Sequence, residues 1–91
     1  MSKRVIRFTA DWCSPCLMYA PQFEAAKSLV EGWEFEAINV DTNSDEAAKY
    51  QIRNIPATII KVNDEVVDRF IGVVSTDDLA KRLNSFAEAT V

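Results

Sequence analysis

The sequence predicts an α/β domain with a mixed sheet of four strands and helices on both faces of the sheet. Runs of strand-forming residues alternate with segments whose apolar residues recur at helical spacing. These segments occur in the order strand, helix, strand, short helix, strand, strand, helix. The chain has 91 residues, of which 48% are hydrophobic, and this suffices for one packed core. We therefore expect a single domain over residues 1–91.

The first two strands are predicted at residues 3–9 and 33–40. The first contains Val5, Ile6 and Phe8, which favour strands, and it ends at a polar segment. A helix is predicted between the two strands. Because strand, helix and strand follow one another, we expect a parallel, right-handed crossover.

The helix of this crossover is predicted to begin near Ser14 and to run for about five turns until Gly32, since glycine favours a helix end. Pro21 lies inside it and should kink the helix, because proline lacks an N–H and its ring clashes with the preceding turn. The apolar positions at helical spacing are Tyr19, Phe23, Ala26 and Val30.

A short helix and a hairpin are predicted next. Ser44 is expected to cap the short helix, which continues to Tyr50. The hairpin strands are residues 58–62 and 66–71, which are rich in β-branched side chains. Residues 63–65 form the turn between them, although no glycine marks the turn type.

The last predicted helix follows the hairpin. Ser75 and Asp78 are three residues apart, which resembles the spacing of a capping box at a helix N-terminus. Leu79, Leu83 and Phe86 then form a single apolar stripe. We therefore expect this helix to pack on one face of the sheet.

The charge and composition exclude several functions. The net charge is −4, which disfavours binding to nucleic-acid phosphates or to anionic membranes. The sequence has no histidine, so the most common general base and metal ligand is missing. No signal-peptide core or membrane span follows the basic residues near the start. We expect a monomer in the cytoplasm.

Two cysteines, Cys13 and Cys16, lie where the first strand gives way to the first helix. In a reducing compartment such a pair is more often catalytic or metal-binding than structural. The unpaired N–H groups and the positive dipole end of a helix lower the pKa of a thiol, so Cys13 is the expected nucleophile. Cys16, one turn further on, could attack a mixed disulfide on Cys13. Pro15 suits the first turn, where its missing N–H costs nothing.

Two other interpretations of the cysteine pair remain open. A structural zinc site needs four protein ligands, and this chain offers two cysteines and no histidine unless it dimerises. The two cysteines could also be small buried apolar side chains without a redox role. The dithiol interpretation requires neither a metal nor a bound cofactor.

Further residues in a fixed order accompany the cysteine pair: Phe8, Ala10, Trp12-Cys13-Ser14-Pro15-Cys16, Met18, Ala20-Pro21, Asn39-Val40-Asp41, Lys49-Tyr50, Ile52-Arg53-Asn54-Ile55-Pro56 and Gly72. With this set the chain resembles the thioredoxin family over most of its length. A thioredoxin-like fold is therefore expected. The chain is shorter at the front and is expected to lack the family's N-terminal strand and helix. This shortened core is also similar to that of glutaredoxins.

The resemblance implies roles for residues around the cysteines. The family proline that matches Pro56 has a cis peptide bond and helps to bind the substrate chain, so we expect Ile55-Pro56 to be cis despite the rarity of such bonds. Trp12 and Gly72 match positions that flank the dithiol and contact partner proteins. Trp12 could instead be a core aromatic residue, and Gly72 could be needed only for backbone geometry.

Several positions depart from the family pattern. Typical thioredoxins have a buried aspartate six residues before the nucleophilic cysteine, where it helps the resolving cysteine to lose its proton. Here that position holds Arg7, and the lysine that accompanies the aspartate is replaced by Ala37. The glycine between the cysteines is Ser14, and the basic residue after the second cysteine is Leu17. The usual acid–base partner is therefore absent.

Arg7 leads to a hypothesis about the redox potential. If its guanidinium lies near the dithiol, it would stabilise a thiolate and make the disulfide a stronger oxidant than in typical thioredoxins. Alternatively, Arg7 points to solvent or pairs with Glu34 or Glu36.

The resemblance implies a thiol–disulfide oxidoreductase that reduces protein disulfides. Cys13 would attack, Cys16 would resolve the mixed disulfide, and an external donor would restore the dithiol. That donor would be thioredoxin-reductase-like or linked to glutathione. In a different class of function, the domain would be a binding module or a subunit of a larger complex in which the dithiol is secondary.

Overall fold

The computed structural model describes residues 2–89, and its sheet has the four strands expected from the sequence. The strands lie in the order β2-β1-β3-β4. β1 (Lys3–Thr9) and β2 (Glu34–Asn39) are parallel, whereas β3 (Ala57–Val62) is antiparallel both to β1 and to β4 (Glu65–Ile71). The mixed sheet and the parallel first connection are therefore confirmed.

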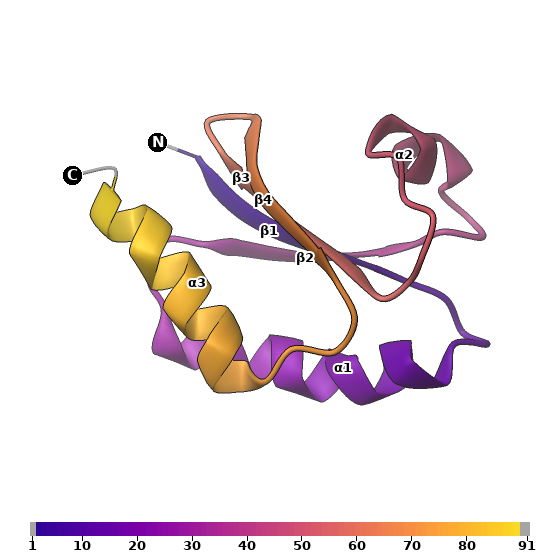
Figure 1. Ribbon diagram of the computed structural model, residues 1–91, viewed down its shortest axis with the longest axis horizontal. Coiled ribbons are helices and arrows are strands. Elements are labelled where there is room, and N and C mark those ends of the chain that lie inside the picture. The colour runs from indigo at the N-terminus through magenta and orange to yellow at the C-terminus, as the bar shows by residue number, and fades with distance from the viewer. Residues whose placement is uncertain (1, 90–91) are drawn as a thin grey trace.

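Helices cover the two faces of the sheet unequally (Figure 1). The longer helices α1 (Ser14–Ala25) and α3 (Thr76–Ala89) lie on one face. The short helix α2 (Ser44–Lys49) lies on the other. Among the described residues, no helix is long and apolar enough to cross a membrane.

Alternation along β1 sends successive side chains to opposite faces. Val5 enters the core beneath α1 and α3, while Ile6 and Phe8 enter the smaller core on the α2 face. The larger core consists of the buried residues Val5, Tyr19, Phe23, Ala26, Ile60, Leu79 and Leu83. The smaller core consists of Ile6, Phe8, Tyr50, Ala57 and Ile59.

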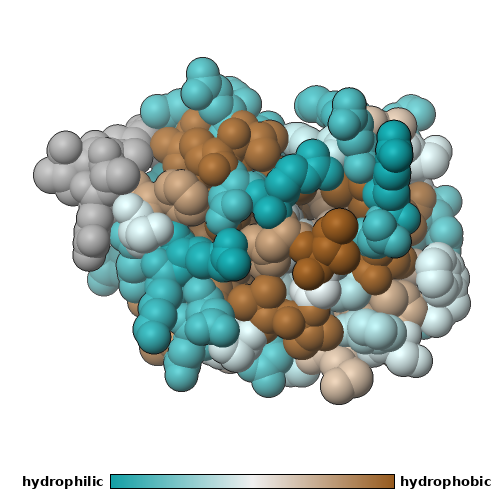
Figure 2. Space-filling model, viewed as in Figure 1, coloured by the Kyte–Doolittle hydropathy of each residue, from teal (hydrophilic) through white to brown (hydrophobic). Residues whose placement is uncertain are grey.

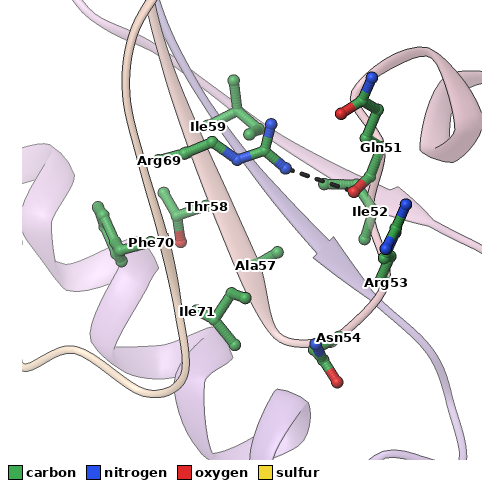
Figure 3. A pocket seen from close by; sticks show the side chains of 10 residues that line it. All are labelled: Gln51, Ile52, Arg53, Asn54, Ala57, Thr58, Ile59, Arg69, Phe70 and Ile71. Atoms are coloured by element: carbon green, nitrogen blue, oxygen red, sulfur yellow. Dashed lines mark hydrogen bonds between the residues drawn. The ribbon is translucent and has the colours of Figure 1, made fainter.

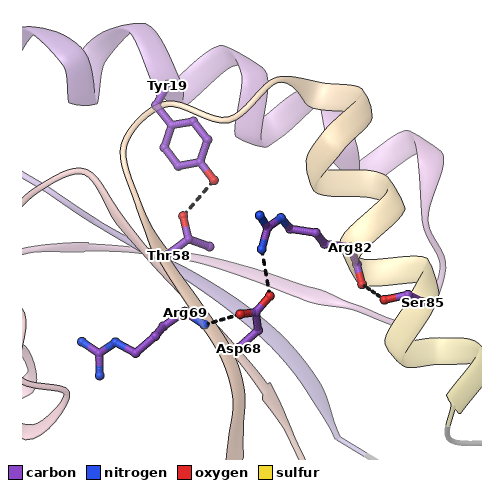
Figure 4. A network of polar contacts seen from close by, with 6 residues as sticks. All are labelled: Tyr19, Thr58, Asp68, Arg69, Arg82 and Ser85. Atoms are coloured by element: carbon purple, nitrogen blue, oxygen red, sulfur yellow. Dashed lines mark hydrogen bonds and ion pairs between the residues drawn. The ribbon is translucent and has the colours of Figure 1, made fainter.

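Polar contacts join both long helices to the sheet (Figure 4). The hydroxyl groups of Tyr19 in α1 and Thr58 in β3 are 2.8 Å apart in the buried interior. The Arg82 guanidinium in α3 donates to the Asp68 carboxylate in β4 at 3.0 Å. These bonds fix the helices relative to the strands that carry the core.

The first helix differs from its prediction. It passes through Pro21 but ends at Ala25, and a 3₁₀ turn over Ala26–Leu29 follows instead of α-helix up to Gly32. Such turns commonly tighten a helix C-terminus. The Ser28 hydroxyl donates to the Ala25 carbonyl oxygen at 3.0 Å, which helps to satisfy a carbonyl that the helix leaves without an internal partner.

Ser44 does not cap α2, so that prediction is wrong. Ser44 is the first helical residue, and Asn43 takes the cap position without a side-chain capping bond. The Asn43 amide instead donates to the Asn39 carbonyl oxygen at 3.1 Å, at the end of β2. The side chain best placed to cap the helix is therefore used by the preceding strand.

The hairpin and the cap of the last helix are confirmed, but the turn is one residue shorter than predicted because Glu65 already belongs to β4 and pairs with Val62. In the hairpin turn Asn63 and Asp64 have φ angles of 53° and 69°, which suit a two-residue turn with left-handed backbone. Asparagine and aspartate tolerate this conformation better than other non-glycine residues. At the start of α3 the Asp78 N–H donates to the Ser75 hydroxyl at 3.2 Å, as the capping spacing predicted.

Candidate active site

The loop after β1 places the two cysteines at the N-terminus of α1. The Cys13 N–H donates to the Ala10 carbonyl oxygen at 3.2 Å, which turns the chain away from the sheet. Cys13 is then the cap residue of α1, with extended backbone, and Pro15 lies in the first turn. The site therefore has the strand-to-helix geometry that the sequence predicted.

Cys13 and Cys16 form a disulfide, with their Cα atoms 5.2 Å apart. The Cys16 N–H donates to Cys13 Sγ at 3.2 Å, so a helix N–H group points at this sulfur. Cys13 is 5% exposed and Cys16 is 1% exposed. A negative charge on Cys13 would be stabilised by this N–H and by the helix dipole, whereas Cys16 is the more enclosed sulfur.

The segment before β3 faces the disulfide. The Ile55-Pro56 peptide bond is cis, as expected. Cys13 Sγ lies 3.9 Å from the Ile55 carbonyl oxygen. The Gly72 N–H donates to the Pro56 carbonyl oxygen at 2.8 Å, and Gly72 has a φ of 102°, which favours glycine. Gly72 therefore has a backbone requirement and also lies beside the proline.

Trp12 is 69% exposed, so it is not a core residue. Its indole N–H donates to the Asp41 carboxylate at 2.8 Å. The Asp41 N–H in turn donates to Asn39 Oδ1 at 2.8 Å. Asp41 was not among the predicted site residues. Its position just after a strand parallel to β1 was the available signal, because the carboxyl ends of such strands meet at one edge of the sheet.

Arg7 and Ala37 are directly opposite each other on β1 and β2, as expected for two replaced partners. Arg7 is half-buried, with its guanidinium carbon 5.5 Å from the centroid of the Phe23 ring. Its Nε atom is buried and has no hydrogen-bond partner among the described residues. Glu36 pairs with Arg4 at 2.6 Å. Within residues 2–89, Arg7 therefore pairs with no glutamate, contrary to one of the two alternatives.

Tyr19 was not predicted as part of the site, although it lies one turn after Cys16. It is fully buried and shares a hydrogen bond with Thr58. Thr58 is the residue of β3 that pairs with Arg7 of β1. Burial raises the pKa of Tyr19, while the bond to Thr58 and the positive charge of Arg7 oppose this shift. The positive charge of Arg7 therefore acts on the pKa of Tyr19, which lies one turn beyond Cys16.

Exposed apolar side chains lie on α1 just after the disulfide and on the segment at the end of β4. Leu17 and Met18 in the first turns of α1 are exposed, while Ser14 is an exposed polar residue. Figure 2 shows apolar side chains over β4 and the segment that leads from it to α3, where Ile71 and Val73 are exposed. Within the described part of the chain, no group of three or more metal-ligating side chains could hold a metal ion.

A cysteine pair at a helix N-terminus, facing a cis-proline segment on this sheet, defines a thiol–disulfide oxidoreductase. Comparisons with known proteins identify the particular family. The thioredoxin family model matches residues 1–85. Thioredoxin 2 from Chlorobaculum tepidum is 37% identical over 81 residues, which are 88% of this chain and 74% of the relative. Thioredoxin from Mycoplasmoides gallisepticum is 32% identical over 81 residues, which are 89% of this chain and 81% of the relative.

Solved structures agree with this result. The crystal structure of Fasciola hepatica thioredoxin superposes with a TM-score of 0.84 at 32% identity, over 92% of this chain and 80% of that one. A mutant thioredoxin from Halobacterium salinarum gives a TM-score of 0.86 at 28% identity, over 92% of this chain and 74% of that one. The chain belongs to the thioredoxin family and is a protein-disulfide reductase.

Proposed function

We propose that this chain, as one thioredoxin-like domain over residues 1–91, reduces disulfides in protein substrates through its Cys13-Ser14-Pro15-Cys16 motif. An external reductase then reduces the Cys13–Cys16 disulfide back to the dithiol. The observation that carries the proposal is the Cys16 N–H directed at Cys13 Sγ at 3.2 Å, at the start of α1. This N–H and the helix dipole favour a thiolate on Cys13, and the thiolate is the form that attacks disulfides.

The first step is attack by the Cys13 thiolate on one sulfur of the substrate disulfide. A bond forms between Cys13 and that sulfur, and the substrate S–S bond breaks. The second substrate sulfur leaves as a thiolate and takes a proton from solvent. The Ile55 carbonyl oxygen, 3.9 Å from Cys13 Sγ, lies where the backbone of the substrate would pass.

In the second step Cys16 loses its proton and attacks the Cys13 sulfur of the mixed disulfide. The substrate leaves as a dithiol, and the Cys13–Cys16 disulfide forms, so two electrons have passed from the protein to the substrate. No carboxylate occupies position 7 to receive the Cys16 proton, since that residue is Arg7. Solvent or the leaving thiolate therefore takes it.

Substrate chains are held by residues that surround Cys13. They come from three segments: Trp12 precedes Cys13, Ile55 and Pro56 face it before β3, and Gly72 bonds to Pro56 after β4. The Trp12 ring is fixed by Asp41 and presents an exposed apolar surface. Such a surface suits proteins that expose apolar residues near a disulfide. Ser14 and Pro15 form the first helical turn between the two cysteines.

Arg7 is assigned a supporting role in tuning the dithiol. Its guanidinium carbon lies 5.5 Å from the ring of Phe23, about two turns beyond Cys16 on α1, and its charge opposes the rise in the pKa of Tyr19 that burial causes. A positive charge in this position favours thiolate over thiol. The disulfide is accordingly a stronger oxidant than one supported by a buried carboxylate.

Insulin reduction with dithiothreitol as donor tests the function. We expect turnover well above that of dithiothreitol alone for the unmodified protein, and none above it for Cys13→Ser. Equal rates for both proteins would contradict the proposal. A Cys13→Ser, Cys16→Ser variant that still supports the biological role would instead favour a binding module.

The donor is tested in the same assay. Thioredoxin reductase with NADPH is compared with glutathione, glutathione reductase and NADPH. We expect the first system to sustain turnover. The cytoplasm is the proposed location, and a monomer is the proposed state, which size-exclusion chromatography with light scattering would check.

A further inference from the structure

A small hollow lies beside the cis-proline segment, between the chain after α2 and strand β4 (Figure 3). Its volume is about 140 Å³. Apolar side chains, including Ile52, Ile59 and Ile71, line part of it. Ile71 is 64% exposed, so one wall of the hollow is open to solvent.

Two guanidinium groups border this hollow. Arg69 donates to the carbonyl oxygens of Tyr50 at 2.8 Å and Gln51 at 3.5 Å, which holds its side chain across the opening. Arg53 is exposed and makes no ion pair or side-chain hydrogen bond within the described residues. Both cations thus border the same apolar space.

No carboxylate of the described chain neutralises these cations at the hollow. None of its lining residues is acidic, although the chain carries a net charge of −4. Asp68, next to Arg69 in the sequence, turns its carboxylate to Arg82 of α3 on the opposite face (Figure 4). The hollow is therefore a local positive site on an acidic protein, and its complement is an anion with an apolar stem.

The hollow is close to the reacting sulfur. Asn54 and Ala57, which line it, flank the Ile55-Pro56 segment, and the Ile55 carbonyl oxygen is 3.9 Å from Cys13 Sγ. An extended chain advances about 3.3 Å per residue. Arg53 and Gln51, which also line the hollow, lie two and four residues before Ile55, so an extended substrate that follows this segment from Cys13 would bring a side chain two to four positions from its reactive cysteine to the hollow.

We propose that this hollow selects disulfide substrates with a glutamate or aspartate two to four residues from the reactive cysteine. The methylene groups of that side chain pack against Ile52 and Ile71, and its carboxylate accepts charge-assisted hydrogen bonds from Arg53 and Arg69. The proposal rests on the disulfide-reductase function and names the substrate class that this site prefers.

The test uses fluorogenic disulfide peptides that differ only in one residue, three positions from the cysteine, which is Glu, Gln or Lys. The measured quantity is the ratio of kcat/KM between the Glu and Gln peptides. We expect a ratio of about five at low ionic strength, falling toward one at about 0.5 M salt, where exposed charges are screened. The Lys peptide should be the slowest.

Two variants locate the effect. Arg53→Gln should bring the Glu/Gln ratio close to one. Lys81→Gln removes the same charge from an exposed position on α3, at the other face of the sheet, and should keep the ratio of the unmodified protein. Because Arg53 holds no other element by a side-chain bond, the Arg53 variant should fold, and circular dichroism checks this.

The outcomes separate the two proposals. Equal kcat/KM values for the Glu and Gln peptides, or a preference that survives Arg53→Gln, would overturn the selectivity and leave the reductase function intact. A preference that Lys81→Gln reduces equally would also overturn it, because net charge would then be the cause. Absence of any Cys13-dependent reduction would overturn the reductase function and this proposal together.

Discussion

The two faces of the sheet differ in thickness and in what they do. One face carries α1 and α3 over a continuous core of seven buried residues. On the other face, the described part of the chain places only the six-residue helix α2, and there the hollow beside Pro56 stays open. The thick face holds the N-terminus of α1, and hence the cysteines, in place. The thin face leaves room for substrate side chains next to the reacting sulfur.

The largest expected effect is loss of packing on the thick face. Phe23 is fully buried between α1 and the sheet and contacts Phe35 with ring centroids 5.2 Å apart. Phe23→Ala should reduce the free energy of unfolding by about 3–5 kcal/mol, through lost burial and the cavity left behind. Urea denaturation followed by circular dichroism measures this loss. A loss under 1 kcal/mol would contradict the scaffold role of this face.

Truncating an apolar side chain on the thin face should reduce the free energy of unfolding by less. Ile52 is only partly buried against the smaller core. Ile52→Ala should therefore reduce the free energy of unfolding by about 1–2 kcal/mol, below the range for fully buried residues. The same denaturation experiment serves as the measurement. If Ile52→Ala proved as damaging as Phe23→Ala, the contrast between the faces would disappear.

The buried bond between Tyr19 and Thr58 should make a smaller contribution. Tyr19→Phe leaves the Thr58 hydroxyl without this partner and should cost about 1–2 kcal/mol at neutral pH. Thr58→Val in the same protein removes the orphaned hydroxyl and should recover part of the loss. The denaturation midpoints of the single and double variants measure these changes in stability. No recovery of stability in the double variant would argue against the bond.

Tyr19 also predicts a pH dependence. Its pKa is raised in the folded state, chiefly by burial, so the unfolded chain ionises first as the pH rises past the usual value near 10. Stability from this group is complete below that pH and is lost above it. The alkaline fall in stability should be shallower in Tyr19→Phe. An unchanged slope above pH 10 would show that Tyr19 titrates normally.

Replacing Arg7 should have the smallest effect, a change in the redox properties of the cysteine pair. Arg7→Ala removes a positive charge from the face of the sheet that α1 covers, and should raise the Cys13 pKa and lower the redox potential of the pair. The pH dependence of iodoacetamide alkylation gives the pKa, and equilibration with a glutathione buffer gives the potential. Lys81→Gln provides a control for net charge. No change in either quantity would eliminate the tuning role of Arg7.

Patterns local in the sequence predicted most of the fold. The strands followed from their β-branched runs, and the Ser75–Asp78 spacing predicted a bond that forms. The errors fell at helix ends. α1 changes to a 3₁₀ turn after Ala25, and the cap position of α2 is taken by Asn43 rather than by Ser44. Contacts with neighbouring segments decide where a helix starts and ends, so local patterns place helix ends least reliably.

For the site, the residues near the cysteines could be predicted, whereas their long-range supports could not. The motif and the resemblance indicated Cys13, Cys16 and Pro56. The bonds from Trp12 to Asp41 and from Tyr19 to Thr58 join residues 29 and 39 positions apart, which no local pattern encodes. The hollow between Arg53 and Arg69 likewise exists only because β4 returns beside the segment before β3.

The roles of the two cysteines are tested most directly by trapping the mixed disulfide. When Cys16→Ser is incubated with disulfide-bonded insulin, it should accumulate a covalent complex through Cys13, because no second thiol resolves the mixed disulfide. The complex should be visible on a non-reducing gel and be released by dithiothreitol. Cys13→Ser should accumulate none, since Cys16 is only 1% exposed. A complex formed by Cys13→Ser and not by Cys16→Ser would contradict the account.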